Sequence, residues 1–501
     1  MNRREGSKFV RASAGAIPSV ATLLALAAAC TAVGRDYEAP APATPLGWRE
    51  DAPTFFSSRS EEIGEWWRRL DDPVLESLVD RALVGGPDVR EALARVREAR
   101  ALRGAAGAER FPTLDAGASY SRVSQSQNSP LGIFVPDSDL YAAGFDASWE
   151  VDLWGRVRRS VEAAEADLQA SVEDARDVAV TLAAETAVNY VELRAFQKRL
   201  EIARTNVALQ EETLGLVRGR FESGLVRERD VAQAATNVES TRARVPALEV
   251  GLRATENRLA VLLGMTPGAL GSELGTASPI PVAPREVAVG VPTDALRRRP
   301  DVRRAERVLA AETARIGVAE GELYPKLALN GNIGLVSSES SNLFERASGV
   351  FSFGPSLRWN VFDAGRRRRE VEAQDARADQ ALVRWQRTVL SALEETENAM
   401  TAFAREHARR DSLAEAAKQG RLAVELARAQ YAEGISDFQA VLDSERALAE
   451  LEDDLARSDS AITTGVIALY KSLGGGWEKQ AGRLTKLDDV ADAPRIARGP
   501  G

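Results

Sequence analysis

The feature that most constrains this chain of 501 residues is an internal repeat. Pro87-Asp88-Val89-Arg90 recurs 213 positions later as Pro300-Asp301-Val302-Arg303. From Trp149 the offset becomes 210 and holds without a gap to the second Leu-Gly pair. The matches include Trp149/Trp359, Gly155/Gly365, Gly224/Gly434 and Leu263-Gly264/Leu473-Gly474. Two copies of one structural unit therefore follow in tandem, joined by the Pro- and Gly-rich stretch 264–292.

Both copies contain the same succession of segments. A helical segment, 74–110 in the first copy and 293–322 in the second, ends at an aromatic residue followed by proline. The residue before a proline is pushed into extended geometry, so we expect strands to follow Phe111-Pro112 and Tyr324-Pro325. After its strands each copy becomes helical again. The same order of elements is therefore predicted twice.

The strand segments alternate between apolar and polar residues. In the first copy Tyr141, Ala143, Phe145, Ala147, Trp149, Val151 and Leu153 alternate with Asp146, Ser148, Glu150 and Asp152. The segments 114–120, 327–335 and 351–361 alternate in the same way. A half-buried sheet in a soluble domain is one reading, but aromatic residues near the ends and a length of about 10 residues favour membrane strands. Four strands cannot close a barrel, so several chains would have to pool theirs.

The long helical segments are predicted to fold as hairpins. No proline occurs between Pro136 and Pro246, or between Pro355 and Pro494. Apolar residues recur there at steps of three and four, which indicates a narrow coiled-coil seam. Gly224 and Gly434 are the expected turns, because glycine tolerates positive φ. Pro246 stands where the second copy has Ala456, so we expect a local kink in the first hairpin only.

The N-terminus has the pattern of a bacterial export signal. Four basic residues between 3 and 11 precede an apolar stretch, 17–29, that is too short to span a membrane. Cys30 follows directly and resembles the lipidated first residue of a lipoprotein. The alternative is a cysteine that falls by chance beside an ordinary signal. A single cysteine at this position favours the lipid.

Composition excludes several classes of function. One cysteine rules out a disulfide framework or a Cys-rich metal site. A single histidine, His407, rules out a metal site built from a His cluster and argues against a His-based catalytic triad. The formal net charge of −9 argues against broad nucleic-acid binding. No run of 18 apolar residues follows the N-terminus. We therefore expect a transport or structural protein with no catalytic site, cofactor, metal or nucleic-acid partner.

Several motifs resemble those of a known family. They are Trp66-Trp67 with Asp72-Pro73-Val74-Leu75, the run 299–306, Ala314-Arg315-Ile316-Gly317-Val318-Ala319 leading to Leu323-Tyr324-Pro325, and the closing Leu473-Gly474-Gly475-Gly476-Trp477. Together they resemble the outer membrane factors, the TolC/OprM-like exit ducts of Gram-negative efflux pumps, in their NodT-type lipoprotein branch. The resemblance covers nearly the whole chain from Cys30 to Trp477.

The resemblance implies a fold class: mainly α with membrane β, a tandem-repeat protomer whose homotrimer forms a 12-stranded β-barrel continued by a long periplasmic α-helical barrel. It implies a passive, gated channel for small molecules in the outer membrane, anchored by lipid, with no catalysis. The implied partners are outer-membrane lipid, a periplasmic adaptor (membrane fusion) protein and an inner-membrane RND-type pump. A type I protein secretion duct is the alternative, and a lipid-anchored periplasmic coiled-coil scaffold a weaker one.

The resemblance also implies site residues. Gln439, Asp443 and Arg446 would lie at a periplasmic gate, with Asp443 forming a carboxylate ring on the pore axis and Gln439 standing where the family usually has leucine. The alternative for Asp443 and Arg446, three positions apart, is a surface ion pair. The tips that would contact the adaptor are Ser223, Gly224, Leu225 and Val226 with Glu433, Gly434, Ile435 and Ser436. Alternatively these residues only cap the arms. The run Arg366–Arg369 is expected near lipid phosphates.

The predicted organisation follows from these features. It comprises a signal peptide (1–29), a lipid-anchored N-terminal segment with the first equatorial and helical part (30–110), the first membrane β-hairpin (111–153), the first long helical hairpin (154–264), the inter-repeat linker and helix (265–322), the second β-hairpin (323–362), the second helical hairpin (363–476) and a C-terminal tail (477–501).

Overall fold

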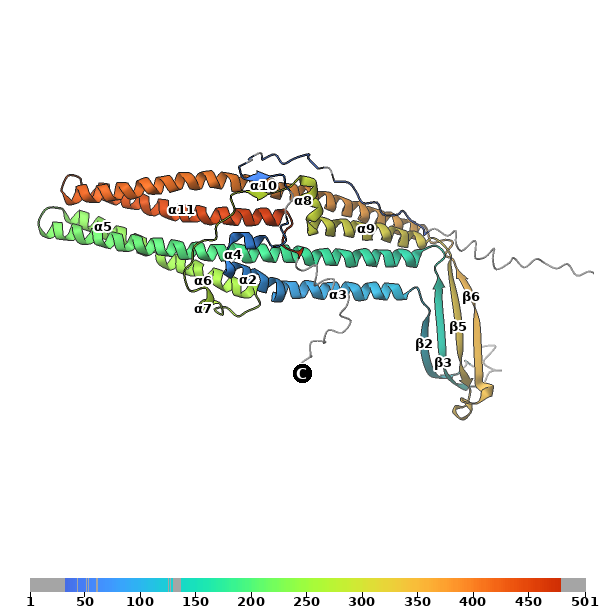
Figure 1. The fold of residues 1–501 in the computed structure, drawn as a ribbon. Coiled ribbons are helices and arrows are strands. Elements are labelled where there is room, and N and C mark those ends of the chain that lie inside the picture. The colour runs from blue at the N-terminus through green and yellow to red at the C-terminus, as the bar shows by residue number, and fades with distance from the viewer. Residues whose placement is uncertain are drawn as a thin grey trace, which may run out of the picture. The chain divides into compact units, whose positions relative to one another are not determined.

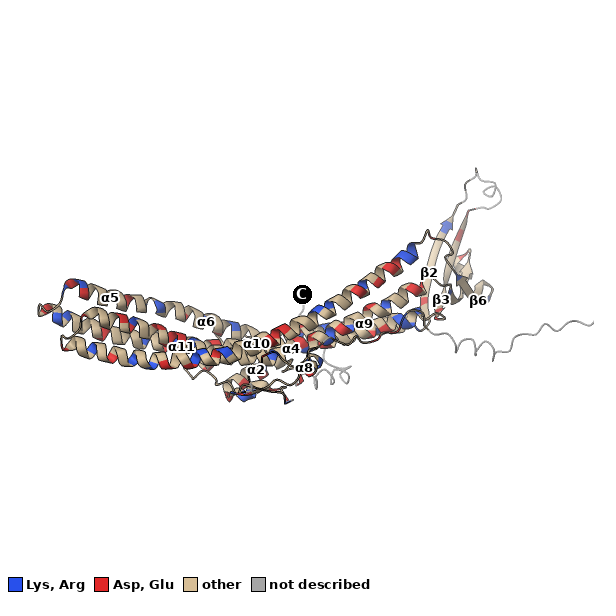
Figure 2. Ribbon diagram, turned by 90° about the horizontal axis from the view of Figure 1, so that it is seen from above, with Lys and Arg blue, Asp and Glu red and all other residues tan. Residues whose placement is uncertain are grey.

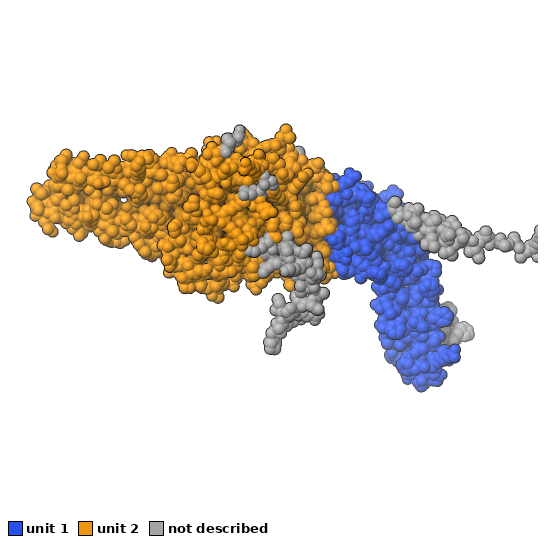
Figure 3. Space-filling view, viewed as in Figure 1, with its two compact units in different colours: residues 1–38, 102–165, 310–379 blue, residues 39–101, 166–309, 380–501 orange. Residues whose placement is uncertain are grey.

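A computed structural model describes residues 32–478, with gaps at 43, 51, 53, 60, 61, 125, 127 and 129–136. The predicted signal peptide, Cys30 and the tail beyond 478 lie outside the described residues. The chain divides into two compact units (Figure 3). The first contains residues 1–38, 102–165 and 310–379, and the second contains residues 39–101, 166–309 and 380–501. Each unit thus draws on both copies of the repeat.

The first unit contains a four-stranded antiparallel sheet (Figure 1). Its strands are β2 (Thr113–Val123), β3 (Ser138–Val151), β5 (Lys326–Ser337) and β6 (Gly349–Arg358), in that spatial order. Two short 3₁₀ helices, η2 (Ser340–Asn342) and η3 (Arg346–Ser348), lie in the connection between β5 and β6. Each copy of the repeat therefore supplies one hairpin, and β3 joins the two hairpins by pairing with β5.

The strand register confirms that the predicted apolar residues within the strands share one face, whereas Leu153, Trp359 and Val361 lie beyond the ends of β3 and β6. Ala116 is opposite Phe145, Phe145 is opposite Ile333, and Ile333 is opposite Phe351. Directly paired residues project to the same side of a sheet. The polar residues occupy the other side, where Ser148 Oγ donates to Asn330 Oδ1 at 3.0 Å. The period-two pattern therefore produces one apolar and one polar face across all four strands.

No described element covers this sheet. Every residue of β2 is exposed, and so are the large apolar side chains of β6: Phe351 is 83% and Leu357 68% exposed. Strands β2 and β6 are the edges, and within the described chain their outer backbone groups pair with no further strand. An apolar face of this kind and two open edges are both unfavourable in water.

The long helices reproduce the repeat. The helices α3 (Pro87–Ala108) and α9 (Pro300–Gly321) contain 22 residues each, and α4 (Arg156–Glu222) and α10 (Arg366–Ala432) contain 67 each. The return arms are α5 (Glu228–Arg242) with α6 (Arg244–Leu262) in the first copy and α11 (Phe438–Ser472) in the second. Matching helices begin and end at residues 213 or 210 positions apart, which confirms the tandem repeat at the level of structure.

Short elements complete the second unit and build its core. They are the 3₁₀ helix η1 (Trp66–Leu70), α2 (Pro73–Gly85), α7 (Gly271–Leu274), α8 (Pro292–Arg298), and the paired strands β1 (Phe56–Ser57) and β4 (Val287–Ala288). Trp66 and Trp67 are fully buried, and Trp66 stacks on Tyr470. Asp72 caps α2 by accepting from the backbone of Val74 and also accepts from Tyr190 Oη at 2.7 Å. The Trp-Trp and Asp-Pro motifs are thus parts of this core.

Charged residues of both signs are interspersed along the helices (Figure 2). Many form pairs three positions apart, such as Arg176 with Glu173 at 2.6 Å. Pairs of this spacing face each other on a helix surface. Within the described ranges, no helix is both long enough and apolar enough to cross a membrane.

The kink predicted at Pro246 is confirmed as a break between two helices. Helix α5 ends at Arg242 and α6 begins at Arg244, whereas α11 runs unbroken through Ala456. Proline has no N–H to donate to the carbonyl four residues earlier, and its ring collides with that carbonyl. The break therefore follows from one residue that differs between the copies.

We expect Pro246→Ala to join α5 and α6, because it restores the N–H that can donate to the Arg242 carbonyl. Backbone amides at 243–247 should then exchange more slowly with deuterium, as measured by mass spectrometry. The reverse change in the other copy, Ala456→Pro, is the matched control and should destabilise α11 by about 3 kcal/mol. Unchanged exchange at 243–247 would contradict this cause for the break.

Candidate functional site

Both helical hairpins of the second unit reverse through the same backbone turn. Gly224 has φ +73° and Gly434 has φ +77°, so both occupy the left-handed region. The Leu225 N–H donates to the Arg220 carbonyl at 2.9 Å, and the Ile435 N–H donates to the Gln430 carbonyl at 2.8 Å. These bonds are typical of a helix that ends in a left-handed glycine. The two tips lie at the same end of their helices (Figures 1 and 2).

The predicted tip residues differ in exposure. Leu225 is 67% and Ile435 70% exposed, whereas Val226 packs against the apolar cluster beneath the tips. Among the small and polar tip residues, Ser436 is half-buried. The others are exposed: Ser223, Gly224, Glu433 and Gly434. In a turn of this type the residue after the glycine often packs back on its own helix. Here two large aliphatic side chains instead point into solvent.

An apolar cluster ties the two hairpins together beneath the tips. Helices α4, α5, α10 and α11 all contribute to it. Its buried members are Leu214, Val217, Ala234, Val238, Ala427, Tyr431, Phe438, Val441 and Leu442. Because the cluster draws on both hairpins, the position of one tip constrains the other.

Arg220 of α4 forms a second tie, directly at the tips. Its guanidinium donates to the carbonyls of Tyr431 and Ala432 at the end of α10, and lies 4.8 Å from the centroid of the Tyr431 ring. A cation is favourable at a helix C-terminus, where carbonyls lack partners within the helix. The equivalent residue in the second copy is Gln430, which carries no charge to cap the other tip in the same way.

The three predicted gate residues lie on one exposed face of α11. Gln439, Asp443 and Arg446 are spaced by four and three positions, and all are exposed. Gln439 Nε2 donates to Asp443 Oδ1 at 2.8 Å, and Arg446 Nε donates to Asn237 Oδ1 of α5 at 3.1 Å. Asp443 and Arg446 form no ion pair with each other within the described chain. The surface-pair alternative therefore has no support inside one protomer.

A buried carboxylate lies directly behind this exposed face. Glu445 is 3% exposed, and residues of three other helices form hydrogen bonds or an ion pair with its carboxylate. Thr213 Oγ1 donates to it at 2.6 Å, Asn237 Nδ2 donates at 3.3 Å, and Arg428 Nε is 3.6 Å from Glu445 Oε1. Burial raises the pKa of Glu445, and these partners oppose that rise.

Sequence reasoning assigned no role to Glu445, Thr213, Asn237, Arg428 or Arg220. A signal was nevertheless present, because the buried residues around Glu445 in the first part of α11, from Phe438 to Ala449, are otherwise apolar. Comparing the copies gives a second signal. The equivalents of Glu445, Thr213 and Asn237 in the other copy are Ala235, Ala423 and Ala447.

The described N-terminal residues are clamped within the first unit. Arg159, whose side chain is 5% exposed, donates to the carbonyls of Val33 and Gly34 at 3.0 Å and to Asp36 Oδ1 at 2.7 Å. A Cβ added to Gly34 would lie 2.6 Å from Gly317 Cα, so the two backbones touch. This clamp holds the segment that follows Cys30 beside the start of α4.

The run Arg366–Arg369 begins α10 and takes part in local ion pairs. Arg366 pairs with Glu370 at 2.6 Å, Arg369 pairs with Glu372 at 2.7 Å, and Arg367 Nη1 donates to the Glu322 carbonyl at 2.6 Å. These contacts hold much of the run against its own helix. Contact with lipid phosphates stays a prediction.

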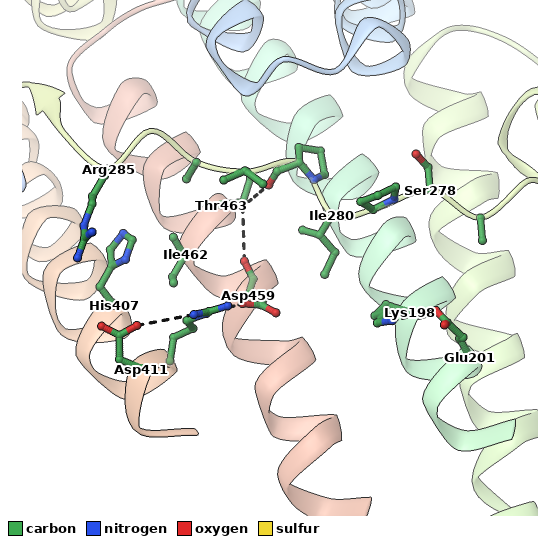
Figure 4. Close-up of a pocket in the computed structure, with 16 residues that line it drawn as sticks. Lys198, Glu201, Ser278, Ile280, Arg285, His407, Asp411, Asp459, Ile462 and Thr463 are labelled. Atoms are coloured by element: carbon green, nitrogen blue, oxygen red, sulfur yellow. Dashed lines mark hydrogen bonds and ion pairs between the residues drawn. The ribbon is translucent and has the colours of Figure 1, made fainter. Parts of the chain in front are cut away.

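A hollow of about 670 Å³ lies elsewhere in the second unit, beneath the linker 277–285 (Figure 4). His407 stacks on Phe55 with ring centroids 4.9 Å apart, and burial, together with nearby Arg285, lowers its pKa. Two ion pairs line the hollow: Lys198 with Glu201 and Arg410 with Asp459. Across the described ranges, no three His, Cys, Asp or Glu side chains are arranged to hold a metal.

We expect Arg220→Gln, which copies the residue of the other repeat, to fray the end of α10. Loss of the charged cap should cost about 1 kcal/mol and speed amide exchange at 430–436 by roughly fivefold. The measurement is hydrogen–deuterium exchange of the purified protein. Arg218→Gln, which changes an exposed arginine of the same helix, is the matched control. Equal exchange in both variants would remove the capping role.

A family model described as "Outer membrane efflux protein" matches residues 78–265 and 291–475. Nodulation protein T of Rhizobium leguminosarum bv. trifolii is 31% identical over 455 residues, covering 90% of this chain and 95% of the relative. The pyoverdine export outer membrane protein OpmQ of Pseudomonas aeruginosa is 31% identical over 483 residues, covering 93% and 99%.

Solved structures share the fold. The outer-membrane channel OprN superposes with a TM-score of 0.83 at 36% identity, covering 89% of this chain and 99% of that one. This likeness confirms the predicted fold class, a mainly α tandem-repeat protomer with membrane β-strands, of the kind that forms trimeric channels. Both the matched ranges and the repeated helices extend over most of the sequence. The chain belongs to the outer membrane efflux protein family.

Proposed function

We propose that three copies of this protein form the passive, gated exit duct of a tripartite pump, through which small molecules leave the periplasm. The observation that carries this proposal is the uncovered four-stranded sheet, with one apolar face, one polar face and two open edges. Neither lipid nor water can satisfy all of these surfaces at once. A closed ring of such sheets can, because closure pairs every edge.

Closure assigns a role to each face. The apolar side, with Phe145, Ile333 and Phe351, faces lipid, and the polar side lines the lumen. A ladder of side-chain bonds crosses the polar side: Asn330 Nδ2 donates to Ser356 Oγ at 2.7 Å, and Ser352 Oγ donates to Asn332 Oδ1 at 2.6 Å. Four strands from each of three chains give the 12-stranded barrel.

The hairpin tips are proposed to contact a periplasmic adaptor, which joins the duct to an inner-membrane RND-type pump. The support is the pair of exposed aliphatic side chains, Leu225 and Ile435, at turns where no core covers them. Single exposed apolar residues are common, but two at matching positions of adjacent tips form a repeated contact point. The name of OpmQ assigns pyoverdine export to that relative, and we propose a small-molecule cargo here on that basis.

The gate is proposed to lie at the exposed face of α11. In a trimer this face would bring three copies of Asp443 together, where like charges repel each other and attract cations. Gln439 holds the carboxylate by its bond of 2.8 Å, so the gate depends on charge and hydrogen bonding rather than on an apolar constriction. Nothing is catalysed in this proposal.

Lipid anchoring at Cys30 is proposed from the position of the clamped segment. Arg159 holds Val33 and Gly34 beside the start of α4, which follows strand β3 after a short turn. Two or three residues of extended chain span at most about 10 Å. The lipid would therefore attach near the end of a membrane strand, and Arg366–Arg369 would lie close to the same lipid surface.

We expect the unheated protein in detergent to have the mass of three protomers, measured by light scattering with the detergent subtracted.

In planar bilayers Asp443→Ala should raise the single-channel conductance, because removing three carboxylates weakens the closed state. Glu425→Ala, at an exposed carboxylate of α10, is the matched control. A monomeric mass would overturn the duct, and an unchanged conductance with an unchanged ion preference would overturn the gate.

Cys30→Ala should abolish labelling with palmitate, because the chain has no other thiol to modify. The trimer should still assemble, because the Arg159 clamp and the sheet do not involve the thiol. Metabolic labelling followed by light scattering checks both expectations. Label that persists in the variant would contradict lipidation at this residue.

A further inference from the structure

The buried cluster around Glu445 connects all four helices of the tip region. Glu445 belongs to α11, Thr213 to α4, Asn237 to α5 and Arg428 to α10. Arg428 Nη2 also donates to Thr213 Oγ1 at 2.6 Å and to the Leu209 carbonyl at 2.9 Å. Among the described residues, Glu445 and Glu256 are the only buried acidic residues, with 3% and 5% of their surface exposed. A charge in this position needs its partners to remain buried.

The repeat does not require this cluster. In the other copy Ala235 occupies the position of Glu445, and there it packs beside the apolar cluster beneath the tips. Thr213 and Asn237 likewise correspond to alanines. A helix of this repeat can therefore fold with a methyl group at that position. The carboxylate is a feature of one site, not of the repeated architecture.

The cluster is bonded directly to the proposed gate. The side-chain amide of Asn237 donates to Glu445 Oε2 and accepts from Arg446 Nε, at 3.3 and 3.1 Å. One amide thus joins a buried carboxylate to an exposed gate arginine. Because both of its polar ends are engaged, a change at Glu445 alters the orientation that Asn237 offers to Arg446.

We propose that Glu445, Thr213, Asn237 and Arg428 form a proton-sensitive positioning network that keeps the two hairpins packed together and orients Arg446 at the gate. This inference rests on the proposed function, since the gate is part of that proposal. None of the four residues is proposed to contact cargo. They act through Arg446 and through the packing of α11 on the first hairpin.

The sign of the proton effect follows from burial. The charged groups that act on Glu445 are Arg428 from α10 and Glu212 from α4. Helix α5 contributes the neutral Asn237, which links Glu445 to Arg446, and Asp443 lies on the exposed face of α11, the helix of Glu445. Burial raises the pKa of Glu445 above its ordinary 4.5. An arrangement that exposes Glu445 returns the pKa to that value, so the packed arrangement binds the proton more tightly. As the pH falls from above the raised pKa of the packed arrangement toward the ordinary pKa, protonation of Glu445 favours packing, and a rising pH opposes it.

Two substitutions at Glu445 separate charge from packing. Glu445→Gln keeps the shape of the side chain and removes the buried charge, so the hairpins should stay packed at every pH and the pH dependence of the conductance should disappear. Glu445→Ala leaves Thr213, Asn237 and Arg428 without their common partner, so conductance should rise at every pH. Glu425→Gln, at an exposed carboxylate of α10, is the matched control.

The measurements are single-channel conductance between about pH 5 and pH 8, which spans the interval above the ordinary pKa of glutamate, and amide exchange of α5 and α11. Wild-type conductance should fall as the pH falls, and Glu445→Gln should flatten that profile. Glu445→Ala should speed exchange in α5 by about tenfold. Asn237→Ala should raise conductance, and Asn237→Gln, which retains an amide, should partly restore it.

The outcomes separate this inference from the proposed function. If Asp443→Ala alters conductance while Glu445→Ala changes neither conductance nor exchange, the network is wrong and the gate stands. If Glu445→Gln keeps the wild-type pH profile, the proton sensitivity is wrong. If Asp443→Ala has no effect while Glu445→Ala speeds exchange in α5, the proposed gate fails, and the orienting role of the network fails with it, although the network still ties the hairpins together.

Discussion

The constraint on which the rest of the structure depends is that a four-stranded sheet with two open edges and an apolar face is incomplete. Within lipid every backbone N–H and C=O needs a partner, so the sheet is stable there only as part of a closed ring. The register supplies what closure needs, since Phe145, Ile333 and Phe351 occupy one side and Ser148 and Asn330 the other. A single chain therefore cannot complete this sheet within lipid.

The repeat builds the scaffold, and the departures from the repeat distinguish one hairpin from the other. Helices α4 and α10 match residue for residue in length, and both tips turn through a left-handed glycine. Pro246 then breaks one return arm, Arg220 caps only one tip, and Glu445 replaces an alanine. If the two hairpins were identical in sequence, nothing in their side chains would distinguish the packing face of one from that of the other. These substitutions give the tip region a defined inner network and an exposed face.

Much of the fold was readable from the sequence because its signals are local and periodic. Alternation placed Phe145 and Trp149 on one face, step lengths of three and four placed the helices, and glycine chemistry placed both turns. The site was less readable. Whether Arg446 bonds to Asp443 or to Asn237 depends on which helix packs behind it, and no local pattern determines that. Motifs such as Trp66-Trp67 were conspicuous in the sequence, yet they serve the core.

A buried charge is a costly way to hold helices together, and that cost has a physical consequence. Ala235 and its apolar neighbours show that the repeat can pack this position with a methyl group, whereas Glu445 must keep Thr213, Asn237 and Arg428 in place to remain buried. A partnered carboxylate loses its bonds together once its partners separate, which adds to the resistance of the packed apolar cluster to small displacements. In the proposed gate the network would therefore favour two discrete arrangements over a continuum, as an element that alternates between closed and open requires.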